Sequence, residues 1–446
     1  AVTGVQTCAL PISVPNLVIY SQHYVGRAGI PWDFPMSYYA MVAFWTAIVR
    51  EGVLPQWLPF QQMGFPFSLQ PQSGIHYLPH WFFPITDVPY TLHAAVVFQC
   101  LHVLAGGYGM FVLVRHLRQS NAEALFAAVA FQCFGGFFSN AEHVDIVRAY
   151  AFTPWLLHVF TLDAAPPGLS TCGVTAPGDS GVAPSRMPWR MPLRMWMIPP
   201  LLYLLLTGGY PGNVFAAGLL TGVYVLWQLG ARVAADRRRG AGLGPTARLA
   251  GLLAVMVGLG CGMAALHLGP LALFSDQFVR AQPLAAAARS GLWVEHLPGL
   301  FLSNVTLPGE ISMTSAYVTL PVLVLACFVP WRVLRAHAVW LTLLLIAVAM
   351  IGDEHVRLGT WVRAHVSLLG LSRFPSSDYR AWVAIPLIVL ATAGLRAVLS
   401  GELGTGALIG RSVFCLAWLG LGTWPRLNPE HARDSACAVG IGVVML

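Results

Sequence analysis

The sequence of 446 residues contains no lysine and few charged residues of any kind. Charged side chains make up 10% of the chain, whereas a soluble domain carries about 25%. All 25 basic residues are arginines, scattered among apolar segments that bring the hydrophobic content to 57%. This pattern argues against a nucleic-acid partner and predicts a protein that crosses a membrane many times.

Organised cysteine spacing is also missing. The sequence has no Cys-x-x-Cys pair and no Cys/His cluster, so it indicates neither a zinc site nor a disulfide framework. A phosphate-cradling Gly-rich P-loop is absent as well, and no nucleotide site is expected. We therefore expect no certain cofactor, and a divalent metal shared by Asp33 and an acid from another loop is an open alternative.

Ten apolar runs are long enough to cross or enter a bilayer. A full crossing needs about 20 residues, and fewer where aromatic residues flank the run. The runs lie at about 88–114, 121–139, 148–163, 195–207, 211–229, 249–275, 316–331, 336–352, 379–398 and 411–424. The sequence thus predicts an all-α polytopic membrane protein with about ten transmembrane or half-membrane helices, occupying residues 88–424, and an unassigned tail at 425–446.

The segments between these runs alternate between two chemical kinds. One kind carries arginine and few acids, and includes a Pro/Gly/Ser-rich linker at 163–186. The other kind is longer, aromatic and acidic. The positive-inside rule places the arginine-bearing kind in the cytoplasm. The acidic kind is then external, and it comprises residues 13–87, 140–147, 276–315 and 353–378.

The first external segment contains the most informative pattern. Ser37 to Arg50 places apolar residues at helical spacing, is too short to span and is expected to lie in the membrane interface. The Pro-, Gly- and aromatic-rich stretch after it must pack on the mouth of the helix bundle, because unpaired backbone groups are not tolerated in lipid. Asp33 precedes the helix and is either a partner of its dipole or a catalytic carboxylate.

Three further external segments are predicted to face the same space as Asp33. They read "NAEHVDIVRAY", "TGGYPGN" and "LSRFPSSDYRAW". Each arginine in them either snorkels to the interface and pairs with a nearby acid, or forms a fork for a lipid-linked phosphate. The candidates in these segments are His143, Arg148, Tyr210, Arg373, Asp378 and Arg380.

An ordered series of motifs resembles the YfhO-type bacterial membrane proteins, which are relatives of the GT-C glycosyltransferases. Asp33 before the interfacial helix is followed by "REGVLPQWLPFQQMGFPFSLQPQSGIHYLP", "HVDIVRAYAFTPWLLH", "TGGYPGN" and "LSRFPSSDYRAWVAIPLIVLATAGL". The series covers roughly residues 31–398. The chain departs from the family in Tyr210, which stands where a histidine is usual, and in Asp378, which lies beside the second arginine of the late motif.

The resemblance implies a GT-C-like bundle that transfers a sugar from a polyprenyl-phosphate donor to a cell-envelope polymer or lipid acceptor. The reaction would take place at the outer face of the bacterial cytoplasmic membrane. Asp33 would deprotonate or orient the acceptor hydroxyl, and Arg373, Arg380 or Arg148 would hold the donor phosphate. The residues expected to contact substrate are Gln72, His76, His143, Tyr210 and Asp378.

Two other functions are compatible with the sequence. A transporter or lipid flippase would place paired charges near the bilayer midplane and would show internal repeats, whereas the charges here gather at the ends of the apolar runs. A non-catalytic scaffold with the same fold is the third possibility. Replacement of Asp33 by asparagine separates these alternatives.

The first twelve residues require a separate explanation. A signal peptide is excluded, because no basic region precedes the short apolar stretch Cys8–Ile12. Residues 2–12, VTGVQTCALPI, match the translation of a common sequencing-adapter string without a mismatch. We expect residues 1–12 to be non-native rather than the remnant of a helix, and the chain to be a fragment that lacks a first transmembrane helix and its C-terminal region.

Overall fold

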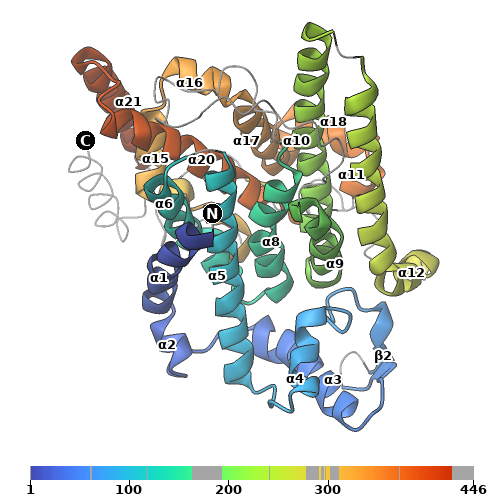
Figure 1. Ribbon diagram of the computed structural model, residues 1–446. Helices are drawn as coiled ribbons and strands as arrows, with labels where there is room; N and C mark the ends of the chain where they lie inside the picture. Colours follow the sequence, from blue (N-terminus) through green and yellow to red (C-terminus); the bar gives the residue numbers. More distant parts are fainter. Residues whose placement is uncertain are drawn as a thin grey trace.

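The computed structural model describes residues 2–60, 63–117, 119–162, 193–240, 242–277, 291–292, 296, 298–301, 311–370 and 372–423. These residues form a bundle of helices with one small hairpin near the chain's beginning (Figure 1). The linker predicted at 163–186, most of the loop at 276–315 and the tail at 425–446 lie outside the described residues.

The elements are, in chain order, as follows. The first part of the chain comprises α1 Val2–Ile19, α2 Ser21–Tyr24, the π-helix η1 Phe34–Tyr39, α3 Ala40–Arg50, β1 Trp57–Leu58, β2 Phe65–Pro66, the 3₁₀ turns η2 Phe67–Leu69 and η3 Leu78–Trp81, α4 Phe82–Ile85, α5 Leu92–His116, α6 Asn121–Gln132, α7 Gly135–Ser139 and α8 Val144–Phe160. The second part comprises η4 Leu193–Met197, α9 Ile198–Gly208, α10 Pro211–Arg238, α11 Gly244–Met263, α12 Ala265–Leu273, η5 Ser275–Gln277, α13 Pro298–Phe301, α14 Ile311–Thr314, α15 Leu320–Cys327, α16 Trp331–Ala336, α17 Ala338–Ile351, η9 Asp353–His355, α18 Arg357–His365, α19 Ser367–Gly370, α20 Pro375–Leu399 and α21 Thr405–Thr423.

Five helical segments of the described chain are long and apolar enough to cross a membrane. They are Leu92–His116, Asn121–Ser139, Pro211–Arg238, Gly244–Met263 and Pro375–Leu399. Their presence supports the prediction of an α-helical membrane protein. Among the described residues, fewer helices are long and apolar enough to span than the ten predicted, because several apolar runs form shorter helices.

The run predicted at 316–331 illustrates the difference. Its helix α15 has only eight residues, which rise about 12 Å and cannot cross a hydrocarbon core of about 30 Å. Pro330 ends this stretch in an extended conformation before α16 begins. Helix α17 has 14 residues and is also too short for a full crossing.

Helix α20 occupies the centre of the bundle, with α15 and α17 as its most extensive neighbours. Most of its side chains are buried, including Trp382 and Tyr379. A Cβ added at Gly394 would lie 1.9 Å from the carbonyl oxygen of Leu325. The absence of a side chain at Gly394 therefore permits the close approach of α15 to α20.

The beginning of the chain differs from the prediction, because Val2–Ile19 forms α1 despite containing two prolines. Ile12 and Asn16 are fully buried against α5 and α6. The Nδ2 of Asn16 donates to the carbonyl oxygen of Cys100 at 3.3 Å. Tertiary packing organises this segment as part of the bundle, whereas residues 13–19 were predicted to belong to the external segment 13–87.

Residues 30–90 form an aromatic cap at one end of the bundle (Figure 1). The predicted helix after Asp33 is present as η1 and α3, and Tyr38, Val42 and Trp45 on its apolar face are buried as their spacing indicated. The Trp45 and Trp81 rings meet edge to face with centroids 4.9 Å apart. Such pairs hold a Pro- and Gly-interrupted segment in place without a long ladder of backbone hydrogen bonds.

Candidate functional site

The structure brings the four predicted segments together at the capped end of the bundle. The Oδ2 of Asp33 lies 3.8 Å from the Nε2 of His143. The backbone N–H of Tyr210 donates to the carbonyl oxygen of Asp145 at 3.3 Å. The Nδ2 of Asn213 donates to the carbonyl oxygen of Asp378 at 3.2 Å. We call this region, formed by residues 30–38, 140–150, 207–213 and 372–380, the Asp33 end.

Asp33 is the most accessible acid of the Asp33 end. It precedes η1, and 65% of its side chain is exposed. His143 also contacts Glu142, whose Oε1 lies 3.8 Å from the Nδ1 of His143. An exposed carboxylate beside an imidazole can accept a proton from a hydroxyl that reaches it.

Behind this pair lies a buried network centred on Asp145, in the first turn of α8. Its Oδ1 accepts hydrogen bonds from the hydroxyl of Tyr38 at 2.8 Å and from the N–H of Ile146 at 3.0 Å. Its Oδ2 accepts one from the Nε2 of Gln72 at 2.8 Å, and the same amide reaches the hydroxyl of Tyr38. Burial, followed by the Asp145 carboxylate, raises the pKa of Tyr38 well above its ordinary value.

Arg148 is fully enclosed rather than open to a ligand. Its guanidinium lies 4.5 Å from the centroid of the Tyr77 ring and donates to the Nε2 of His80 at 2.7 Å. Gly74 packs against Arg148 and His80 and has a positive φ of 65°. A Cβ at Gly74 would lie 2.7 Å from the His80 ring. Burial and the nearby Arg148 charge hold the pKa of His80 well below its ordinary value.

Asp378 and Arg380 are likewise buried, at the start of α20. The hydroxyl of Ser372 donates to the Oδ2 of Asp378, and Gly212 packs directly on that carboxylate. Arg380 donates to the Oγ of Ser139 at 2.5 Å and to the carbonyl oxygen of Ser312 at 2.6 Å. Two of the three arginines expected to hold phosphate thus stabilise the packing of the Asp33 end.

Arg373 is the third candidate, and it is half-buried in the turn before α20. The neighbouring Arg363 organises this turn by donating to the carbonyl oxygens of Leu369 at 3.1 Å and Ser372 at 3.4 Å. The Nε of Arg363 also lies 2.9 Å from the Oδ1 of Asp353. The turn is therefore held in one conformation by a buried guanidinium that is itself paired.

An apolar groove of about 690 Å³ begins near this turn. It is lined by side chains of α8, α9, α10 and α11, together with Val366 and Leu369. Val214 and Leu206, close in sequence to Tyr210, line it near the Asp33 end, whereas Leu229 and Ala250 lie far along α10 and α11. The groove can accommodate an alkyl chain that runs along the bundle from the Arg373 turn.

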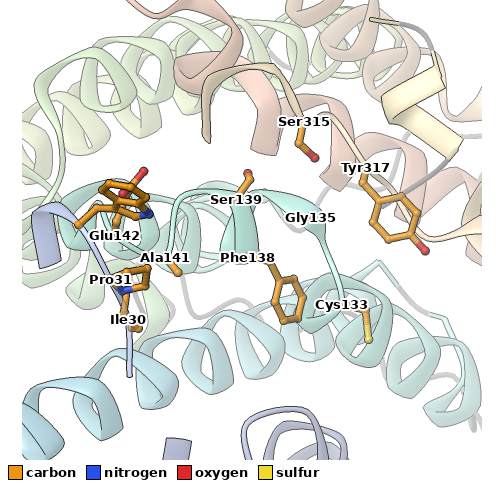
Figure 2. A pocket seen from close by; sticks show the side chains of 11 residues that line it. Ile30, Pro31, Cys133, Gly135, Phe138, Ser139, Ala141, Glu142, Ser315 and Tyr317 are labelled. Atoms are coloured by element: carbon orange, nitrogen blue, oxygen red, sulfur yellow. The ribbon is translucent and has the colours of Figure 1, made fainter. Parts of the chain in front are cut away.

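A second cavity of about 490 Å³ is lined by residues 30–32, which directly precede Asp33 in the chain, and by α7 (Figure 2). It differs from the groove in having hydroxyl and carboxylate groups in its wall, namely Ser139, Ser315 and Glu142. Neither cavity was indicated by the sequence, because each is assembled from segments distant along the chain.

His76 lies away from the Asp33–His143 pair, and its ring contacts that of His267 with centroids 5.4 Å apart. No group of three or more His, Cys, Asp or Glu side chains within the described residues is arranged to hold a metal ion. Within the part of the chain that the structure describes, Asp33 forms its ion pair with His143.

Sequence reasoning missed the roles of Tyr38, Ser139 and Ser315. Tyr38 was interpreted only as part of an apolar helix face, although the hydroxyl of a buried tyrosine usually forms a hydrogen bond. The two serines carry no motif, and only the fold places them in one wall. Comparison of the chain with protein-family models, with curated proteins and with solved structures found no match.

Proposed function

We propose that the protein is a membrane glycosyltransferase that moves a sugar from a polyprenyl-phosphate donor to a cell-envelope acceptor at the outer face of the bacterial cytoplasmic membrane. The observation that carries the proposal is the position of Asp33. It is an exposed carboxylate held beside His143, at the end of the bundle where a long apolar groove begins.

The groove suits the donor's tail. Its wall is almost entirely apolar, so an isoprenoid chain in it loses no hydrogen bonds. The half-buried Arg373 lies in the turn that follows Leu369, a residue of the groove wall, and the phosphate would emerge there. A guanidinium pairs with phosphate through two parallel N–H donors. Because Arg148 and Arg380 are buried, Arg373 is the preferred phosphate ligand of the three arginines.

The proposed transfer is a displacement at the anomeric carbon. The acceptor hydroxyl gives its proton to the carboxylate of Asp33, and its oxygen forms a bond to that carbon. The bond from the carbon to the phosphate oxygen breaks, and its electron pair leaves with polyprenyl phosphate. This leaving group is already a stable anion, so charge stabilisation by Arg373 matters more than protonation.

Asp33→Asn tests the proposal, and Asp87→Asn is the matched control. Asp87 lies in the same cap, is 90% exposed and forms an ion pair with Arg50 at 4.0 Å. The assay supplies membrane vesicles with polyprenyl-phosphate-linked glucose, mannose, galactose and arabinose and measures both transfer to envelope material and translocation of the lipid. We expect Asp33→Asn to lower transfer at least about 100-fold and Asp87→Asn to retain it. Wild-type transfer by Asp33→Asn, or translocation without transfer by the unmodified protein, overturns the proposal.

A further inference from the structure

The cavity beside Asp33 has the lining of a carbohydrate site. We propose that it binds a sugar ring of the acceptor and directs one hydroxyl of that ring to Asp33. The inference rests on the proposed glycosyl transfer for its catalytic consequence, whereas binding of the sugar itself requires no donor.

The polar side of the cavity can exchange hydrogen bonds with sugar hydroxyls. Ser139 and Ser315 face a common space in Figure 2, with Glu142 at one end of it. The Oγ of Ser139 accepts a hydrogen bond from Arg380, so its own hydrogen is available to donate. A carboxylate and two hydroxyls in one wall suit a ligand that carries several hydroxyl groups.

The apolar side supplies aromatic surface. Trp32, Phe138 and Tyr317 line the cavity, and Trp32 is 74% exposed at its rim. Trp32 also has a φ of 58°, an unfavourable conformation for a bulky residue. Strain of this kind is found where a side chain is held in place for a ligand. Flat aromatic faces beside hydroxyl-binding groups match the two chemically different faces of a sugar ring.

The two residues of the proposed catalytic pair each directly follow a residue that lines this cavity. Trp32 directly precedes Asp33, and Glu142 directly precedes His143, whose Nε2 lies 3.8 Å from Asp33. A ring seated between Trp32 and Glu142 therefore has a hydroxyl within the neighbourhood of the Asp33 carboxylate. The groove, which shares no lining residue with this cavity, is left for the donor.

An alkyl chain fits the cavity less well than a sugar. Its volume of about 490 Å³ lies within the range of small-ligand pockets, about 300–1,000 Å³. A chain filling it would remove water from Ser139, Ser315 and Glu142 without replacing their hydrogen bonds, which is unfavourable. The groove has no comparable set of polar groups in its wall.

Cysteine accessibility provides a direct test, because Cys133 lines the cavity and Cys261 lines the groove. The protein in lipid nanodiscs is treated with iodoacetamide, with and without the methyl glycosides of glucose, mannose, galactose, N-acetylglucosamine and arabinose. Mass spectrometry follows each cysteine separately. We expect at least one glycoside to slow alkylation of Cys133 several-fold and to leave Cys261 unchanged.

Variants locate the bound sugar. Trp32→Ala and Glu142→Gln are expected to weaken binding of the protecting glycoside at least about 10-fold in calorimetric titration. The control is Trp361→Ala, which removes an exposed tryptophan outside the cavity. The inference is overturned if no glycoside protects Cys133, if the two cavity variants bind as the control does, or if octanol protects as well as any glycoside.

These outcomes are distinct from failure of the proposed function. Glycoside binding at the cavity in a protein that transfers no sugar would leave the site and remove the reaction. Loss of transfer in Asp33→Asn with no glycoside binding would leave the reaction and remove the site.

Discussion

The Nη2 of Arg148 and the Nε2 of His80 form a hydrogen bond of 2.7 Å in the interior of the Asp33 end. The other ring nitrogen of His80 lies 2.8 Å from the carbonyl oxygen of Gly74, which can only accept a hydrogen bond. The hydrogen of His80 is therefore on Nδ1, and Nε2 accepts from Arg148. The pair is stable only while His80 is neutral, because a proton on Nε2 would face the guanidinium.

This geometry predicts a protein that loses stability in mild acid. Unfolded His80 would titrate near pH 6.5, while burial and Arg148 lower its pKa in the folded protein. The unfolded state thus binds more protons below pH 6.5, and stability falls as pH decreases by up to about 1.4 kcal/mol per pH unit. Thermal unfolding between pH 7.5 and 5.0 measures the slope.

Histidine variants separate the contribution of His80 to that slope. His80→Asn should lower stability at pH 7.5 and reduce the pH dependence, and His365→Asn, at an exposed position, should preserve the wild-type slope. His76 and His23 also have pKa values lowered by burial and act in the same direction. An unchanged slope in His80→Asn would show that His80 is not a buried neutral group.

Tyr38→Phe is predicted to destabilise the Asp33 end. It removes the hydroxyl that donates to Asp145 and accepts from Gln72, and leaves buried partners unsatisfied at a cost of about 1–3 kcal/mol. Tyr39→Phe is the matched control, since Tyr39 contacts Tyr90 through its ring, with centroids 5.9 Å apart. Chemical unfolding in detergent compares the two, and equal stability of both variants would contradict the network.

Gly394→Ala is predicted to disturb the packing of α15 on α20. Its Cβ would lie 1.9 Å from a backbone oxygen of Leu325, which no side-chain rotation can relieve. We expect a loss of about 1–3 kcal/mol. A Cβ at Gly230 on α10 would have no atom within 4 Å apart from its chain neighbours and the backbone of its own helix. Gly230→Ala is therefore expected to be neutral or to stabilise the helix by up to about 1 kcal/mol. Thermal unfolding of both variants tests the contrast, and a stable Gly394→Ala would show that the helices are farther apart.

Arg373→Gln is predicted to weaken binding of a lipid phosphate by about 10–100-fold, since a hydrogen bond to a charged group contributes about 1.5–3 kcal/mol. Arg357→Gln is the control, because Arg357 is exposed on α18. Citronellyl phosphate is a suitable probe in calorimetric titrations. Equal affinity of the two variants would assign the phosphate to another residue.

Periodicity located most elements, but it did not define their lengths. The apolar spacing of Tyr38, Val42 and Trp45 correctly predicted the helix after Asp33, because one buried face repeats every 3.6 residues. The run at 316–331 became the short α15, and 353–378, predicted only as an external segment, holds η9, α18 and α19. Apolar content measures burial without specifying whether lipid or protein covers the side chains.

The candidate site was predicted as a set of segments but not as a set of contacts. In the structure, direct contacts link the segment of Asp33 to that of His143, the segment of Asp145 to that of Tyr210, and Asn213 to Asp378. Which arginine is accessible could not be predicted, since Arg148, Arg373 and Arg380 share one chemistry and differ only in their neighbours.

The sequence by itself determined that this protein is not surrounded by water alone, because a chain with 10% charged and 57% hydrophobic residues has too little polar surface to face water throughout. It also determined which acidic and basic residues lie at the ends of apolar runs. Only the tertiary structure decided that Arg148 is enclosed by His80 and Tyr77, while Asp33 stays exposed beside a cavity. His80 and Arg148 are 68 positions apart, and burial depends on contacts that no local pattern encodes.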